Sequence, residues 1–354
     1  MLSGNVGEWS EIFVVLRLLA DGHVALCNSR LEPIPGKRIK VLEVHRTSSE
    51  GILKFSIDPD GETIRFSSGD VIGKRDELEE LLIALLMALR AGGKSIELPQ
   101  LESLLARMRT YQLAAPSSGK SDLKVLVEDG VTGRRSAMSF SVKSQIGGAA
   151  TLLNASSATT FRYEATGPKP ALNSLARSGM KTSKMLAESQ NLGVTFSTGR
   201  PINETFRMNL QMIDTGMPGV LASMLFGHFS GEGAMVSDVM GYLEAQDPLE
   251  VGTPMADVFY EHKIKDFLVD VALGMTPSKR WDGTFVTSAG FLIVTRVGQV
   301  VCLLFEDRDV FREYLYTNTK FERGSQSRHK YGSLVNPPEA PSYLDLNLQI
   351  RFTK

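Results

Sequence analysis

The chain has 354 residues, of which 42% are hydrophobic and 22% charged, which is the balance of a folded protein with one large or two ordinary domains rather than a disordered one. The formal net charge of −1 excludes a global attraction to nucleic acid, so any such contact needs a local group of basic residues. Two cysteines and five scattered histidines exclude a zinc cluster, and the lack of a long apolar run or secretory leader predicts a cytoplasmic protein without a membrane partner.

The N-terminal part of the chain predicts a helix, several short strands and a second helix. The first helix has apolar residues at helical spacing from Trp9 to Leu19 and ends at Asp21-Gly22. Alternating runs at 38–46, 51–58 and 62–68 predict strands. A stripe of leucines from 78 to 89 predicts the second helix, and Asp76 and Glu79 have the spacing of a capping box at its start.

The remaining elements change character near residue 167. Before it, the pattern predicts strands at 122–128 and 136–145, then a helix turning into a strand over 151–165. After it come helical segments at 171–190, 206–228, 234–245 and 255–274, a β-hairpin around Gly298 and a short helix at 307–319. This change predicts a domain boundary near 167, with a helix-rich region and a C-terminal hairpin after it.

The stretch Ala114-x-x-x-x-Gly119-Lys120-Ser121 has the spacing of a phosphate-binding loop. Such a loop requires a buried strand before it and a helix after it, so that the helix N-terminus cradles the phosphates. Here the preceding residues have helical spacing and the following ones alternate like a strand. The flanking pattern therefore argues against a nucleotide hydrolase.

The strands at 122–128 and 136–145 place an acid and a lysine on one polar face. Ser141, Lys143 and Gln145 share one side of the second strand, opposite its apolar residues. If the hairpin turns near residue 132, Asp122 lies across from Ser141 to Lys143. This arrangement suits metal-assisted phosphodiester hydrolysis, in which a carboxylate binds Mg²⁺ and a lysine orients or deprotonates the attacking water. The alternative is an ordinary surface ion pair.

Nucleases of this design carry a second acid two residues before the lysine, where this chain has Ser141. A substitute acid could come from the first helix, because Glu8 and Glu11 are one turn apart. Glu8 lies in the same row as Ile12 and Leu16, which favours Glu8 over Glu11 as the metal ligand. The alternative is that both are first-turn acids favoured by the helix dipole.

Several long blocks of the chain, in order, resemble the HpaII-type restriction endonucleases within the PD-(D/E)xK nuclease superfamily. The blocks are "GEWSE" (7–11), "SDLKVLVEDG" (121–130), "FSVKSQIGG" (140–148), "TLLNASSATTFRYE" (151–164), "YEHKIKDFLVDVALGMTPSKRWDG" (260–283) and "NTKFERGSQSRHKYG" (318–332). The resemblance implies a mixed α/β (α+β) fold, with a nuclease core at 1–166 whose central mixed sheet is flanked by helices. It also implies a mostly helical DNA-recognition region with a β-hairpin at 167–354.

The same resemblance implies a type II enzyme that makes Mg²⁺-dependent double-strand cuts at the palindrome CCGG. Its partners would be double-stranded DNA and a cytosine methyltransferase that protects the same site. Asp122 would be the first metal-binding acid, Lys143 the lysine and Ser141 the variable acid position, with Glu8 or Glu11 as the first-helix acid. No Pro precedes Asp122, which departs from the superfamily motif. A palindromic target is compatible with a homodimer or with two sequential cuts.

Reading C·G pairs requires donors to guanine, which Arg and Lys supply best. The C-terminal block provides such groups, and the candidate DNA contacts are Arg323, Ser325, Ser327, Arg328, His329 and Lys330, with Asn154 and Ser156 as weaker candidates. Basic residues also occur without any acid from Gly167 to Ala187. The alternatives are a solvated basic face and a sequence-specific DNA-binding protein without catalysis, which would not require Asp122 and Lys143 together.

Overall fold

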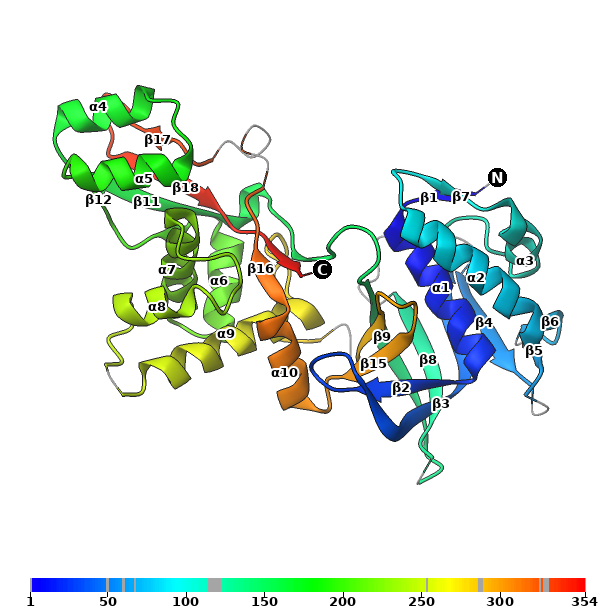
Figure 1. Cartoon of the computed structure of the whole chain (residues 1–354). Helices are drawn as coiled ribbons and strands as arrows, with labels where there is room; N and C mark the ends of the chain where they lie inside the picture. Colours follow the sequence, from blue (N-terminus) through cyan, green and yellow to red (C-terminus); the bar gives the residue numbers. More distant parts are fainter. Residues whose placement is uncertain are drawn as a thin grey trace. The chain divides into compact units, whose positions relative to one another are not determined.

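The computed structural model describes residues 2–48, 51–58, 61–66, 68–113, 122–130, 132–252, 254–285, 289–324, 326 and 331–353. The chain forms two compact units (Figure 1). Unit 1 contains Met1–Ala150, Val286–Phe311 and Lys354, and unit 2 contains Thr151–Phe285 and Arg312–Thr353. Both units combine helices and strands, which confirms the expected mixed α/β class.

Unit 1 is built on a nine-stranded sheet with the order β2-β15-β14-β9-β8-β3-β4-β5-β6. Its strands are β2 (His23–Cys27), β3 (Pro33–Ser48), β4 (Gly51–Ile57), β5 (Thr63–Phe66), β6 (Val71–Lys74), β8 (Leu123–Glu128), β9 (Arg135–Ser144), β14 (Gly290–Val294) and β15 (Val300–Leu304). The sheet is mixed, because β9 pairs antiparallel with β8 and parallel with β14. The strands expected from the sequence in this unit, including the hairpin around Gly298, all belong to this one sheet.

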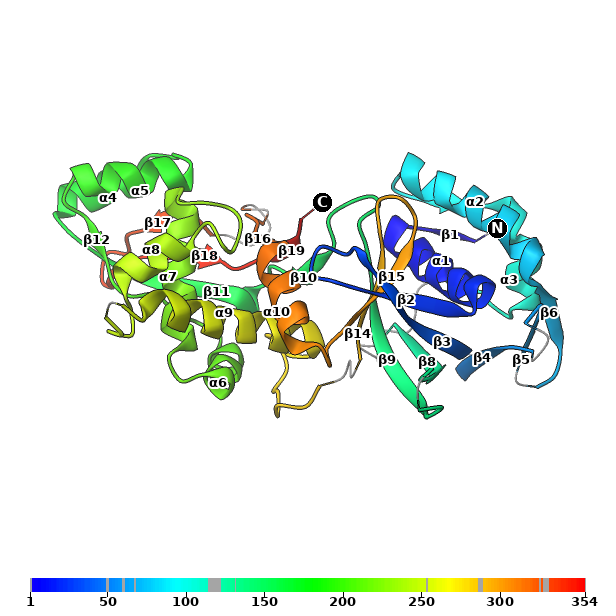
Figure 2. The ribbon, with the colours of Figure 1, turned by 60° about the horizontal axis from the view of Figure 1, so that its bottom comes forward.

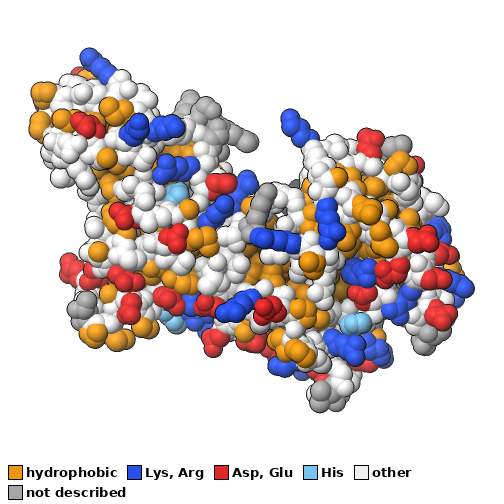
Figure 3. Space-filling model, in the orientation of Figure 1, with side chains coloured by type: hydrophobic (Ala, Val, Ile, Leu, Met, Phe, Trp, Pro, Cys, Tyr) orange, Lys and Arg blue, Asp and Glu red, His pale blue; other side chains and the backbone are white. Residues whose placement is uncertain are grey.

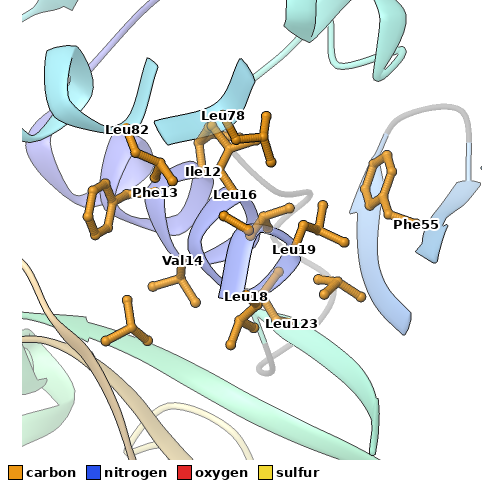
Figure 4. Packing of buried hydrophobic residues seen from close by; sticks show 14 of the residues in the cluster. Ile12, Phe13, Val14, Leu16, Leu18, Leu19, Phe55, Leu78, Leu82 and Leu123 are labelled. Carbon is orange, nitrogen blue, oxygen red and sulfur yellow. The ribbon is translucent and has the colours of Figure 1, made fainter. Parts of the chain in front are cut away.

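Helix α1 (Val6–Asp21) forms the centre of unit 1, between the sheet and α2 (Arg75–Ala91) (Figure 2). The side chain of Asn5 caps its first turn, and Gly22 ends it in the left-handed conformation at φ 67°. Its apolar residues are buried on both sides, as Figure 4 shows for Phe13 beside Leu82 and for Leu18 beside Leu123. Each such side chain contributes about 1.5–3 kcal/mol when fully buried.

The start of α2 differs from the sequence prediction. The helix begins at Arg75, its N-cap residue is Lys74, and no side chain caps it, so the predicted capping box of Asp76 and Glu79 was wrong. The carboxylate of Glu79 instead accepts hydrogen bonds from Arg17 of α1 at 2.9 and 3.1 Å. Glu79 therefore contacts another helix, whereas the local sequence pattern predicted that it would cap its own.

The remaining elements of unit 1 lie before β8 and β9 in the chain. Strands β1 (Ser3–Gly4) and β7 (Ile96–Glu97) form a short antiparallel pair, followed by the 3-10 turn Pro99–Leu101 and by α3 (Glu102–Arg107). The phosphate-loop stretch at 114–121 lies outside the described residues. Its flanks are a helix before and strand β8 after it, as the sequence predicted and opposite to what a phosphate-binding loop requires.

Unit 2 packs helices against two small sheets. The larger has the order β12-β11-β18-β17, with β13 also paired to β11, and the smaller has the order β10-β19-β16. Its strands are β10 (Thr151–Leu153), β11 (Thr160–Thr166), β12 (Thr195–Phe196), β13 (Arg200–Pro201), β16 (Thr319–Phe321), β17 (Leu334–Val335), β18 (Ser342–Asn347) and β19 (Ile350–Phe352). Its helices are α4 (Lys169–Arg177), α5 (Thr182–Asn191), α6 (Glu204–Ile213), α7 (Met217–Ser230), α8 (Met240–Gln246) and α9 (Ala256–Leu273), and α10 (Arg308–Thr317) leads into it from unit 1.

Three expectations for this half of the chain need correction. The helical segments 171–190 and 206–228 are each two helices, interrupted where Gly179 takes a φ of 59° and at Asp214–Gly216. The helix expected within 151–165 is a strand and one 3-10 turn, Ser157–Thr159. The units divide at residue 150 rather than 166, and the hairpin of β14 and β15 belongs to unit 1 because β14 pairs with β9.

Candidate active site

Asp122 and Ser141 lie opposite each other where β8 begins and β9 approaches its end. The pairing of Leu123 with Phe140 sets this register, and the backbone N–H of Asp122 donates to the carbonyl of Phe140 at 3.0 Å. Oδ2 of Asp122 accepts hydrogen bonds from the hydroxyl of Ser141 at 3.0 Å and from the backbone N–H of Val142 at 2.6 Å. The juxtaposition predicted from strand alternation is therefore confirmed, and two donors fix the orientation of the carboxylate.

Lys143 extends this arrangement by one residue. Its ammonium donates a hydrogen bond of 2.8 Å to the Ser141 hydroxyl, which in turn donates to Asp122. The same ammonium lies 5.3 Å from the centre of the Phe291 ring, which β14 places beside β9. Burial lowers the pKa of Lys143, while the charges of Asp122 and Glu11 oppose this shift. Ser141 thus links the lysine to the acid through two hydrogen bonds.

The two acids of α1 have different surroundings. Oε2 of Glu8 accepts a hydrogen bond of 2.8 Å from the backbone N–H of Asn5, and the Asn5 side chain accepts from the N–H of Glu8, so Glu8 completes a capping box. Glu11 is half-buried, and burial followed by the charge of Asp122 raises the pKa of Glu11 to about 7. The sequence interpretation preferred Glu8, but the structure brings Glu11 into electrostatic contact with Asp122, Lys143 and Arg46.

Arg46 is a charged residue of this site that the sequence reasoning missed. It is 1% exposed on β3, and Nη2 donates to the carbonyls of Gln112 at 3.1 Å and Leu113 at 2.5 Å. Nε and Nη1 are buried without a hydrogen-bond partner among the described residues. Burial lowers the pKa of Arg46, and the charge of Glu11 opposes the shift. The signal was present in the sequence, since Arg46 is two residues after buried Val44 and therefore faces the core.

The donor set fits a hard divalent cation that keeps part of its water shell. No group of three or more His, Cys, Asp or Glu side chains suited to a metal occurs in the described part of the chain. Mg²⁺ in phosphoryl-transfer sites commonly takes only one or two carboxylates, with water and substrate oxygens completing the shell. Burial, and after it the negative charge of Asp122, raises the pKa of Glu11, and a bound cation would offset both effects.

Gln145, expected on the same polar face, is bonded elsewhere. Its backbone N–H donates to the carbonyl of Val294 at 2.9 Å, and its side-chain Oε1 accepts from the N–H of Arg296 at 3.3 Å. These bonds join the end of β9 to the β14–β15 hairpin. In this structure Gln145 thus supports the strand that carries Lys143 and has no hydrogen bond to Asp122 among the described residues.

The candidate DNA contacts are only partly within the described residues. Ser325, Ser327, Arg328, His329 and Lys330 lie outside them. The Arg323 guanidinium donates to the carbonyls of His228 at 3.2 Å and Phe229 at 3.4 Å and lies over the Phe229 ring, so it anchors the chain within unit 2. Asn154 is exposed, whereas Ser156 caps the 3-10 turn that follows it.

Comparison with known proteins yields one family and one full-length relative. The family described as HpaII restriction endonuclease matches residues 5–352. The Type II restriction enzyme HpaII of Haemophilus parainfluenzae is 33% identical over 358 residues, which cover 99% of this chain and 98% of that protein. No solved structure matches the chain. Among the described residues, no helix is both long and apolar enough to cross a membrane.

Proposed function

The chain belongs to the HpaII restriction endonuclease family and is a type II restriction enzyme, and from this we propose that it makes Mg²⁺-dependent double-strand cuts at the palindrome CCGG. The observation that carries the chemical part of the proposal is the hydrogen-bonded series Asp122–Ser141–Lys143 with Glu11 beside it. A DNA-binding protein without catalysis would not require an acid and a lysine in this arrangement. The nuclease unit would then have the PD-(D/E)xK type of core.

In this mechanism Asp122 and Glu11 would hold the metal ion. Both hydrogen bonds to Asp122 are to Oδ2, and among the described residues Oδ1 accepts none, so Asp122 keeps an oxygen with which it could bind a cation. When bound, Mg²⁺ supplies charge that stabilises the transition-state oxygens of the phosphodiester and lowers the pKa of a bound water. Glu11 must be deprotonated to bind, so its raised pKa makes metal affinity dependent on pH near neutrality.

As an ammonium Lys143 would orient the attacking water, and as the neutral amine formed by losing one proton to solvent it would accept a proton from that water. One N–H of the ammonium donates to the Ser141 hydroxyl at 2.8 Å. Its other N–H groups can donate to water and to a phosphate oxygen. The lowered pKa of Lys143, caused by burial, makes proton release easier than from a lysine in water. Ser141 holds Lys143 and Asp122 at a fixed separation, and Arg46 balances the negative charge of Glu11 from the side of the core.

The recognition part of the proposal rests on the block that contains Arg328, His329 and Lys330. Arginine can bond guanine O6 and N7 together, and such a pair discriminates by about 1–3 kcal/mol, whereas lysine at a phosphate contributes salt-dependent affinity. We assign Arg328 to base reading and Lys330 to phosphate. A cytosine methyltransferase acting on the same sequence would protect cellular DNA, and a cytoplasmic homodimer would cut both strands at once.

Incubation of unmethylated phage DNA with the protein and Mg²⁺, followed by sequencing of the fragment ends, tests the proposal. Cleavage at CCGG that requires Mg²⁺ and that prior cytosine methylation blocks is the expected result. Fragment ends at another fixed sequence would replace CCGG but keep the nuclease. If the protein binds DNA but does not cut it with any divalent metal, that result favours the alternative of a DNA-binding protein without catalysis.

A further inference from the structure

Four basic side chains lie at one end of unit 2, in a segment of the sequence without acids. Lys169 and Arg177 lie on α4, and Lys181 and Lys184 lie at the start of α5; all four are exposed. The segment from Gly167 to Ala187 contains no Asp or Glu. Within the part of the chain that the structure describes, none of the four forms an ion pair, whereas several cations elsewhere in unit 2 do. We call these four residues the α4–α5 face.

The lack of any acid from Gly167 to Ala187 indicates that the face has a use outside the fold. Several other cations of this unit are paired with carboxylates: Arg162 with Asp345 at 2.8 Å, Lys265 with Glu313 at 2.6 Å, Arg312 with Asp266 at 3.2 Å and Arg351 with Glu322 at 2.7 Å. A group of unpaired cations on one surface is the electrostatic footprint of a protein that binds a polyanion. Figure 3 shows blue side chains gathered over this end of unit 2, at the upper left.

The inner sides of both helices are already used for packing. Ala171, Leu172 and Leu175 of α4 and Met185 and Leu186 of α5 are all buried. The cations therefore occupy the solvent side of two anchored helices rather than a loose loop. Ordering such a surface on binding costs little, because the backbone is held before the partner arrives.

The first turn of α5 also holds the chain on both sides of residues 327–330. The Thr182 hydroxyl is buried; it donates to the carbonyl of Gly332 at 2.9 Å and accepts from the side-chain amide of Gln326 at 3.0 Å. A Cβ on Gly332 would come within 2.5 Å of that hydroxyl, and the φ of this residue is 86°. Glycine is thus required for the close approach, and Gln326 and Gly332 are held next to Lys181.

We propose that the α4–α5 face binds the phosphate backbone of double-stranded DNA. The partner is identified by its chemistry, since two helices present separated cations in a segment without acids, which matches the repeated negative charges of a nucleic-acid backbone. The inference rests on the proposed function, because it takes DNA to be the substrate. It adds a contact surface on helices that lie before the C-terminal block in the sequence, bonded through Thr182 to the residues that border that block.

The test is the salt dependence of DNA binding by the full chain, measured with Ca²⁺ in place of Mg²⁺ on duplexes with and without CCGG. In Lys181→Gln/Lys184→Gln, the slope of log affinity against log salt should fall by about 0.9 for each phosphate that the variant no longer neutralises. Affinity should drop alike for both duplexes, because binding to phosphates carries no sequence information. Adding Lys169→Gln and Arg177→Gln should lower the slope further.

The matched control is Lys54→Gln/Lys74→Gln, which removes two exposed lysines on β4 and β6 of unit 1 and should leave the slope unchanged. An unchanged slope in the α4–α5 variants, with wild-type cleavage intact, overturns the inference and leaves the proposed function standing. A fall of equal size in the control overturns it as well. Failure of the proposed function appears separately, as a wild-type protein that binds but never cuts DNA.

Discussion

The hydroxyl of Ser141 lies 3.0 Å from Oδ2 of Asp122 and donates a hydrogen bond to it, although the two residues are 19 positions apart in the chain. The same hydroxyl accepts from Lys143 at 2.8 Å. A serine thereby joins the acid and the lysine that the proposed chemistry requires. Removing each member of this series has a distinct expected result.

Asp122→Ala and Lys143→Ala should each abolish cleavage while leaving binding to DNA largely intact. The first change removes a metal ligand, and the second removes the group that handles the attacking water, which is worth roughly 10²–10⁴-fold in rate. Cleavage under single-turnover conditions and binding in Ca²⁺ measure the two properties. Normal turnover by either folded variant would show that the catalytic site has been misplaced.

Ser141→Ala should reduce turnover less than Asp122→Ala does. It deletes one hydrogen bond to a charged group on each side, worth about 1.5–3 kcal/mol, but leaves both charged residues in place. A loss of roughly 10–100-fold in rate corresponds to that energy. Ser141→Thr keeps the hydroxyl and serves as the control. Equal losses in Ser141→Ala and Asp122→Ala would mean that the hydroxyl has a direct part in the reaction.

Glu11→Gln should raise the Mg²⁺ concentration needed for half-maximal cleavage, whereas Glu8→Gln should leave it near the wild-type value. Glu11 shares its electrostatic surroundings with Asp122, while Glu8 is bonded to the backbone of Asn5. The Glu8 change should cost less than about 1 kcal/mol of stability, because the Gln amide oxygen can still accept the hydrogen bond from the Asn5 N–H. Titration of cleavage with Mg²⁺ and urea unfolding of both variants separate these effects, and a metal requirement raised only by Glu8→Gln would reverse the assignment.

The stability of the metal-free protein should fall as the pH rises from about 4.5 to above 7. Burial and Asp122 raise the pKa of Glu11 to about 7 in the folded state, so the folded chain binds this proton more tightly than the unfolded chain, whose ordinary pKa is 4.5. Glu11→Gln should remove this contribution and stabilise the protein by roughly 3 kcal/mol at pH 8, at about 1.4 kcal/mol per pKa unit between 4.5 and about 7. Urea unfolding at pH 5 and 8 measures it, with the exposed Glu80→Gln as control. A Glu11→Gln gain that is the same at both pH values would contradict the assigned cause.

Arg323→Ala should lower stability rather than sequence selectivity. Its guanidinium is bonded to the carbonyls of His228 and Phe229 and lies over the Phe229 ring, which together are worth about 1–3 kcal/mol. Arg328→Ala should instead narrow the difference in binding between CCGG and a one-base variant. Thermal unfolding and competition binding on both sequences measure these effects for both variants. A loss of sequence selectivity in Arg323→Ala alone would show that Arg323, rather than Arg328, reads the bases.

Much of unit 1 followed from the sequence because its elements carry strong local patterns. The stripe of α1, the leucines of α2 and the alternation of β8 and β9 each predicted the right element, and the register of one hairpin was enough to bring Asp122 to Ser141. The capping box predicted for α2 failed because of a partner distant in sequence. Glu79 bonds to Arg17 instead of capping its own helix.

The strands of unit 2 were harder to predict for a related reason. Strand β19 has only three residues and pairs with β10, nearly two hundred positions earlier. Such a strand has no periodicity of its own that a local pattern could reveal. Arg46 was overlooked because an arginine in an alternating strand is usually placed on the solvent side, whereas here the guanidinium is buried near Glu11.

The parallel pairing of β14 with β9 has a consequence for synthesis of the protein in the cell. Asp122, Ser141 and Lys143 leave the ribosome early, but Phe291, whose ring lies beneath the Lys143 ammonium, comes from a strand made after most of unit 2. A nascent chain that stops before residue 289 cannot complete the sheet around its own lysine. Long-range strand pairing of this kind forms slowly, since distant segments must meet first. The order of translation thus delays completion of the catalytic strands until nearly the whole chain, including the segment bearing the α4–α5 face, has been made.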